Sequence, residues 1–173
     1  MPKSMWPLVA VLSVAVGCSG DALSPEPAGE LAVQVTPGRV HAERSQTGGI
    51  EWLQFRINLE VKNGAEDVVV PHCGTSVQRK EGVEWRTVWT PYCDLALRPP
   101  DVLKAGKSRD GQSHIMGVLA GNAGPKWQSA SVSGQYRLVY PTFPWSRAEG
   151  RMPPNAEAQL HYSNTFEVVD GSE

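Results

Sequence analysis

The three cysteines are the residues of this chain with the clearest chemical meaning, because they stand in two different contexts. Cys18 closes an apolar run, whereas Cys73 and Cys93 lie in the more polar remainder of the chain. The spacing of Cys73 and Cys93 is not the C-x-x-C of redox sites. A metal site that adds His72 is the alternative, but it lacks the second close ligand pair of structural zinc sites. If the chain is exported, a disulfide between Cys73 and Cys93 is the expected outcome.

Other patterns that could indicate catalysis or cofactor binding are incomplete. Residues 106–108 (Gly-Lys-Ser) match the tail of a phosphate-binding loop, but Asp101 stands where that motif needs its first glycine. His114 and Met116 have a spacing found in copper carriers, without the further ligands that such sites need. The sequence contains no G-x-S-x-G motif and no calcium-loop pattern. We therefore expect no catalytic residue, no metal and no cofactor.

The N-terminal segment has the pattern of an export signal. Lys3 is its only charge before Asp21, and the apolar run over residues 5–16 is shorter than the about 20 residues that span a membrane. The run ends in Ala-Val-Gly-Cys at residues 15–18, which resembles the lipobox of bacterial lipoproteins, with Ala15 in place of the usual Leu. The resemblance implies that residues 1–17 are a lipoprotein signal peptide and that Cys18 carries fatty-acyl chains. An ordinary secretory leader or an N-terminal membrane anchor is the alternative.

The segment after the lipobox indicates how the rest of the chain is attached. Residues 18–30 are small, polar and rich in proline, which predicts a flexible tether. Ser19 follows Cys18, and the sorting pattern of some Gram-negative bacteria then favours the outer membrane. We therefore expect a lipoprotein of the cell envelope, anchored in a membrane, with its domain in the periplasm or outside the cell.

Residues 31–170 show the alternation of apolar and polar residues that is typical of β-strands. The clearest case is the segment 52–61, in which every odd position is apolar. A hairpin is predicted across Glu81 and Gly82, and no segment shows a convincing helical period. At the end of the chain Leu160, Tyr162, Phe166 and Val168 share one parity, which predicts one strand with these residues on the core side. About seven or eight such segments predict an all-β fold, an antiparallel β-sandwich.

Three short segments resemble those of bacterial immunoglobulin-like domains. Residues 134–139 are similar to the start of strand F, with Tyr136 in the position of the tyrosine corner. Residues 103–108 and 163–168 are similar to the turn before strand E and to the closing strand G. Leu138 stands where antibody domains have a cysteine, so the inter-sheet disulfide of antibodies is absent. The order of the segments also resembles the intracellular proteinase-inhibitor family, without its diagnostic inhibitory loop.

Charge and loop composition narrow the function. The chain has 16 Lys and Arg against 18 Asp and Glu, so bulk positive charge does not predict nucleic-acid binding. The connection over residues 141–154 is long, and it contains residue types enriched at protein interfaces: Phe143, Trp145, Arg147 and Arg151. These four are the predicted partner-binding residues, although such a loop can also fold its aromatic residues onto the sheet. The sequence thus predicts a lipid-anchored, non-enzymatic binding or structural module, with a sandwich-type proteinase inhibitor as the alternative.

The lipobox makes a prediction about the anchor. Replacing Cys18→Ser removes the thiol that accepts the lipid, so the variant is expected to lose its fatty-acyl label and leave the membrane fraction. Metabolic labelling with a fatty-acid analogue measures this. A label of wild-type intensity on the Cys18→Ser variant would contradict the proposed anchor.

The cysteine pair makes a second prediction. Mass spectrometry without reduction is expected to find Cys73 joined to Cys93, closing a loop of about 21 residues that contributes roughly 3 kcal/mol of stability. Replacing both by Ser is expected to lower the melting temperature while the fold is retained. Two thiols that react with an alkylating reagent in the folded, oxidised protein would show the prediction to be wrong.

Overall fold

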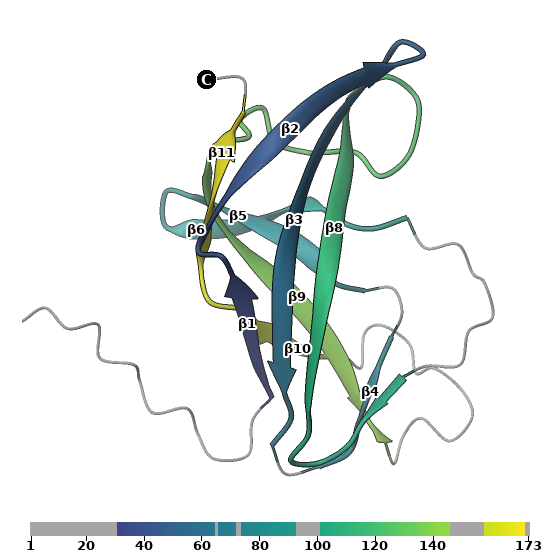
Figure 1. Cartoon of the computed structure of the whole chain (residues 1–173), viewed down its shortest axis with the longest axis vertical. Coiled ribbons are helices and arrows are strands. Elements are labelled where there is room, and N and C mark those ends of the chain that lie inside the picture. Colours follow the sequence, from purple (N-terminus) through teal and green to yellow (C-terminus); the bar gives the residue numbers. More distant parts are fainter. Residues whose placement is uncertain (1–30, 65, 72–73, 93–100, 146–157, 172–173) are drawn as a thin grey trace, which may run out of the picture.

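The computed structural model describes residues 31–64, 66–71, 74–92, 101–145 and 158–171 (Figure 1). Within these ranges the chain forms eleven β-strands and no helix, which confirms the prediction of an all-β fold. Of the predicted site residues, Cys18, Cys73, Cys93, Arg147 and Arg151 lie outside the described residues. The predicted lipid anchor and disulfide therefore stay predictions.

The described residues contain more strands than the seven or eight expected. In chain order they are β1 (Ala32–Thr36), β2 (Arg39–Thr47), β3 (Ile50–Lys62), β4 (Val68–Val70), β5 (Ser76–Glu81), β6 (Glu84–Trp89), β7 (Asp101–Leu103), β8 (Ser108–Ala120), β9 (Gly134–Pro144), β10 (Gln159–Tyr162) and β11 (Phe166–Asp170). The hairpin predicted across Glu81 and Gly82 is confirmed, because β5 and β6 pair across this turn.

The strands form two layers with the main core between them (Figure 1). The first layer contains β1, β2, β3 and β8, and the second contains β5, β6, β9, β10 and β11. The short strands β4 and β7 extend the second layer beside the end of β9. Both layers contribute side chains to the main buried cluster, and it contains five aromatic residues: Phe55, Trp89, Trp127, Tyr136 and Phe166.

Strand β3 has the inside-out alternation that the sequence predicts. Its residues Leu53, Phe55, Ile57 and Val61 are buried, and the even-numbered residues between them are exposed or partly exposed. Since successive side chains of a strand point to opposite faces, one face of β3 lies on the core and the other on the surface. The outer face of β3 is therefore polar apart from the partly exposed Trp52.

Strand β2 belongs to both layers, which differs from two separate antiparallel sheets. It pairs with β3 in antiparallel fashion from Glu43 to Thr47 and with β11 in parallel fashion from Arg39 to Ala42. The two layers are thus parts of one continuous, curled and mixed sheet. An ion pair between the guanidinium group of Arg44 and the buried carboxylate of Asp170 fastens β2 to the end of β11.

Tyr136 makes the hydrogen bond expected of a tyrosine corner. Its ring is fully buried, and its hydroxyl donates to the main-chain oxygen of Val132 at 2.5 Å. Burial raises the pKa of Tyr136 to about 12, so the phenol stays protonated throughout the physiological range. The hydrogen bond holds the segment before β9 against the strand that follows it.

The tyrosine corner predicts the cost of removing one hydroxyl. Tyr136→Phe leaves the Val132 oxygen buried without its donor, and is expected to lower the free energy of unfolding by about 1–3 kcal/mol. Tyr140→Phe is the matched control, because Tyr140 is also buried and its hydroxyl bonds to no described residue. Chemical denaturation of both variants measures the difference. Equal losses in the two variants would show that the corner hydrogen bond does not stabilise the fold.

Candidate binding surfaces

The outer face of the second layer carries a row of large side chains along β9. The odd-numbered residues of β9 point to this face, and β10 lies alongside, with Leu160 opposite Pro141 and Tyr162 opposite Val139. Trp145 follows directly after β9, and Trp85 of β6 lies beside Arg137. We call the set of Trp85, Arg137, Trp145, Leu160 and Tyr162 the outer stripe.

The outer stripe contains three large apolar side chains that are about half exposed. Trp145 is 46% exposed, Leu160 is 53% exposed and Tyr162 is 47% exposed. These are three of the six exposed large hydrophobic residues in the described part of the chain. Exposed apolar groups that gather on one face indicate an interaction surface more strongly than scattered ones do.

Phe143 is not available to a partner, which corrects the sequence prediction for this residue. It is 1% exposed and packs with Val69 in a small separate core. The reason is that β9 continues past Tyr140 to Pro144, where Phe143 pairs with Val69 of β4. Phe143 is therefore part of a small core with Val69 and Ala158, and the aromatic residue left at the surface is Trp145.

Arg137 is held between two aromatic rings of the outer stripe. Its guanidinium carbon lies 4.5 Å from the centre of the Trp85 ring and 4.0 Å from that of Tyr162. Its Nε donates to Oε1 of Gln78 at 2.9 Å. Burial lowers the pKa of Arg137, and no carboxylate of the described residues pairs with it. The stack thus presents a fixed, uncompensated positive charge, to which a carboxylate of a partner can bind.

The other end of the outer stripe is fixed by Asp67. The Trp145 amide donates to the main-chain oxygen of Asp67 at 3.1 Å, while the Asp67 carboxylate accepts from the Ala105 amide at 2.9 Å. The same carboxylate binds Nζ of Lys104 at 2.7 Å, and that nitrogen lies 5.8 Å from the centre of the Trp145 ring. Gly106 completes the turn with a positive φ of 66°. Trp145 is therefore anchored at its backbone while its ring faces solvent.

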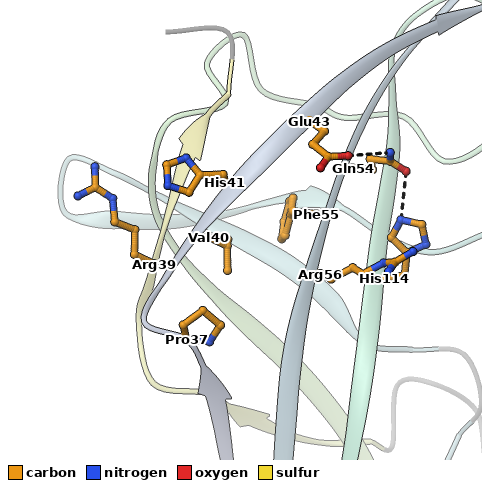
Figure 2. Close-up of a pocket in the computed structure, with 9 residues that line it drawn as sticks. All are labelled: Pro37, Arg39, Val40, His41, Glu43, Gln54, Phe55, Arg56 and His114. Atoms are coloured by element: carbon orange, nitrogen blue, oxygen red, sulfur yellow. Dashed lines mark hydrogen bonds between the residues drawn. The ribbon is translucent and has the colours of Figure 1, made fainter.

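A groove on the first layer is the second candidate surface (Figure 2). It forms where β2 leaves β3 to join β11, and it has a volume of about 500 Å³. Val40 and Phe55 contribute its apolar part, and its polar lining consists of Arg39, His41, Glu43, Gln54, Arg56 and His114. The groove is open to solvent, and four of its six polar residues are Arg or His.

The groups around the groove are partly bonded to one another. The Gln54 amide nitrogen donates to Glu43 at 3.3 Å, and its oxygen lies 3.2 Å from Nε2 of His114 (Figure 2). Arg39 pairs with Glu167 on β11 at 3.4 Å. Arg56 and His41 are the exceptions, because neither side chain has an ion pair or hydrogen bond among the described residues. These residues also contain no cluster of three His, Cys, Asp or Glu side chains suited to a metal ion.

Leu160 and Tyr162 do not lie where the sequence pattern predicts. The pattern places them on the core side with Phe166 and Val168, but only Phe166 and Val168 are buried. The strand is broken between β10 and β11, where the Ser163 hydroxyl accepts the Leu138 amide and the Asn164 side chain bonds to both main-chain groups of Val35. The Ser-Asn-Thr cluster at residues 163–165 is a turn signal that could have revealed the break.

Comparisons with known proteins add little to these observations. No family model matches the sequence, and no curated protein matches it. Among solved structures, the chain is similar to the X-ray structure of the Northeast Structural Genomics Consortium target SoR45, with 10% sequence identity and a TM-score of 0.45. The similarity covers 83% of this chain and 88% of that chain. Within the described residues there is no helix long and apolar enough to cross a membrane.

The contacts of Asp67 predict how its carboxyl group titrates. The hydrogen bond from Lys104, with that from the Ala105 amide, lowers the pKa of Asp67 below its ordinary value of 3.8. A lowered pKa stabilises the folded state above the ordinary value, and this contribution is lost as the pH falls through the lowered one. NMR titration of Asp67 is expected to show the low pKa, and Lys104→Met is expected to raise it. An identical titration in the Lys104→Met variant would contradict this account.

Proposed function

We propose that this protein is a lipid-anchored, non-enzymatic binding module of a bacterial cell envelope that contacts a protein partner through the outer stripe. The observation that carries the proposal is the exposure of Trp145, Leu160 and Tyr162 on one face of the second layer. The lipobox at Cys18 supports the anchor.

The composition of the outer stripe supports a protein partner. Trp, Tyr and Arg are the residue types that contribute most to binding energy at protein interfaces. Paired strands and the contacts of Asp67 hold these side chains in place, so little conformational entropy is lost when they bind. Such a surface can bind a partner without a large rearrangement.

The charges next to the apolar residues indicate the chemistry of the partner. Arg137 lies at one end of the outer stripe, and Lys104 lies beside Trp145 at the other. Arg137 has no carboxylate partner among the described residues, whereas Lys104 is paired with Asp67. We therefore infer a partner with an apolar patch flanked by at least one Asp or Glu that reaches Arg137.

The alternative from the sequence, a sandwich-type proteinase inhibitor, requires a different surface. Such an inhibitor would insert a loop into the cleft of an enzyme, whereas the outer stripe is the face of a sheet. Inhibition of a protease panel would favour the alternative, and it would be unaffected by changes in the outer stripe.

Trp145 and Phe143 together give a sharp test of the proposal. Trp145→Ala is expected to weaken partner binding by about 2 kcal/mol or more, because an anchoring aromatic residue is lost, with little change in melting temperature. Phe143→Ala is the matched control, since it empties a buried site two residues away and is expected to cost about 3–5 kcal/mol of stability. Binding is measured as the yield of the cross-linked complex in intact envelopes.

The cross-linker itself can be placed to test the surface. A photoreactive residue at Leu160 is expected to capture a discrete partner protein, whereas one at Gln34, exposed on the first layer, is not. Equal capture at both positions would contradict the proposal. A strongly lowered melting temperature of Trp145→Ala with an unchanged yield of complex would show that Trp145 is a structural residue instead.

A further inference from the structure

Strand β8 forms an edge of the first layer. Strand β3 lies along one side of β8 in a continuous register from Ser108 to Val118. On the other side, the described part of the chain supplies a main-chain partner only at Val118, which bonds with Pro125 and Trp127. A sheet edge with free amide and carbonyl groups can pair with another strand.

The alternation of an antiparallel ladder shows which groups of β8 face outward. Both main-chain groups of Val118 bond away from β3, to Pro125 and Trp127. The main-chain groups of every second residue before Val118 must also face away from β3. These residues are Met116, His114, Gln112 and Asp110. The Met116 oxygen agrees with this alternation, because it accepts Nε1 of Trp89 at 2.9 Å. With respect to the described residues, the open part of the edge therefore runs from Asp110 to His114, about 17 Å of strand.

We propose that two copies of this chain pair through their β8 edges, antiparallel and related by a two-fold axis at Gln112. In this register the outward groups of Gln112 face those of the partner's Gln112, and those of Asp110 face those of the partner's His114. Directly opposed residues of this type exchange two hydrogen bonds. The three opposed pairs therefore form about six main-chain hydrogen bonds between the copies. This arrangement joins the first layers of both copies into one sheet.

The charges on the outer face favour a second copy as the occupant of this edge. In the register of β3 and β8, Arg56 lies opposite His114, and Glu60 lies opposite Asp110. The two-fold axis then aligns Arg56 and His114 of one copy with the partner's Asp110 and the partner's Glu60. The same basic–acidic row is repeated on the other side of the axis. His114 then lies directly opposite the partner's Asp110, and Arg56, which has no ion pair among the described residues of its own chain, lies one strand further away in the same row.

The residues next to the two-fold axis are also compatible with pairing of two copies. Gln112 lies opposite Asn58 on the same outer face, so amides meet amides at the axis. Among the described residues of one copy, Glu60 has an ion pair with the exposed Lys62 alone, at 3.0 Å. An interface between identical patches must be self-complementary, and a strand with acidic and basic ends meets this condition when it runs antiparallel to its copy.

The interface is short, so its strength depends on the local concentration of the chain. One pair of strand edges buries less surface than a standard protein interface. Two copies held in the same membrane meet at a raised effective concentration. The strength of the dimer in cells thus rests on the proposed lipid anchor, whereas its register does not. Cys18 labelling tests the anchor separately.

Cross-linking on the axis tests the pairing in the full-length protein. Gln112→Cys is expected to give a disulfide-linked homodimer on mild oxidation of membranes, because opposed Cα atoms about 5.5 Å apart are within disulfide range. Gln34→Cys, exposed on β1, is the matched control and is expected to stay monomeric, as is the wild type. Absence of a homodimer, or capture of a different protein by Gln112→Cys, would overturn the proposal.

Exchange of the charges tests the register. Asp110→Lys leaves the partner's His114 without an opposite carboxylate, and His114→Asp places a carboxylate opposite the partner's Asp110. Each change is expected to raise the dissociation constant of the dimer about tenfold or more. The double variant restores the complementary pair in the opposite sense, so dimerisation is expected to recover. Sedimentation of the detergent-solubilised lipoprotein measures this, with melting temperatures as the check on folding. No recovery in the double variant, or no loss in the single ones, would exclude the proposed register.

Discussion

The shared strand β2 is the constraint on which the rest of the structure depends. Its first half pairs with β11 and its second half with β3, so one strand joins the two layers along one side. Arg44 binds the carboxylate of Asp170 where the change of partner occurs, and the Gly171 amide donates to the Ala42 oxygen at 2.8 Å. A Cβ atom at Gly171 would lie 2.6 Å from that oxygen, so the approach of β2 to the end of β11 requires a glycine.

The position of the core follows from this junction. With the layers joined by β2, rings from both meet in the space between them, and Tyr136 lies 5.8 Å from Trp127 and 6.2 Å from Phe166 between ring centres. Gly117 on β8 leaves room for Trp127, because a Cβ atom there would lie 3.3 Å from that side chain. The gap where β2 leaves β3 becomes the groove of Figure 2, so the groove is a consequence of the topology.

Features of the fold that depend on local pattern could be predicted from the sequence, and those that depend on distant pairing could not. The alternation in β3 and the hairpin of β5 and β6 are local, because period two and a turn residue suffice. The sharing of β2 depends on β11, more than a hundred residues away, and no pattern within Arg39–Thr47 indicates it. In β6, a bulge turns both Val88 and Trp89 toward the core, which simple alternation excludes.

The same distinction explains the candidate sites. Trp145 could be identified from its residue type and its place after a strand, but the burial of Phe143 depends on pairing with β4. The resulting surfaces differ in chemistry: the second layer presents aromatic side chains around Arg137, and the first presents charged rows on β3 and β8. Because the outer stripe and the β8 edge lie on different layers, pairing of two copies through β8 leaves both outer stripes free. A dimer of this kind would present two copies of the same aromatic surface to its partners, and bivalent binding then compensates for weak binding at each copy.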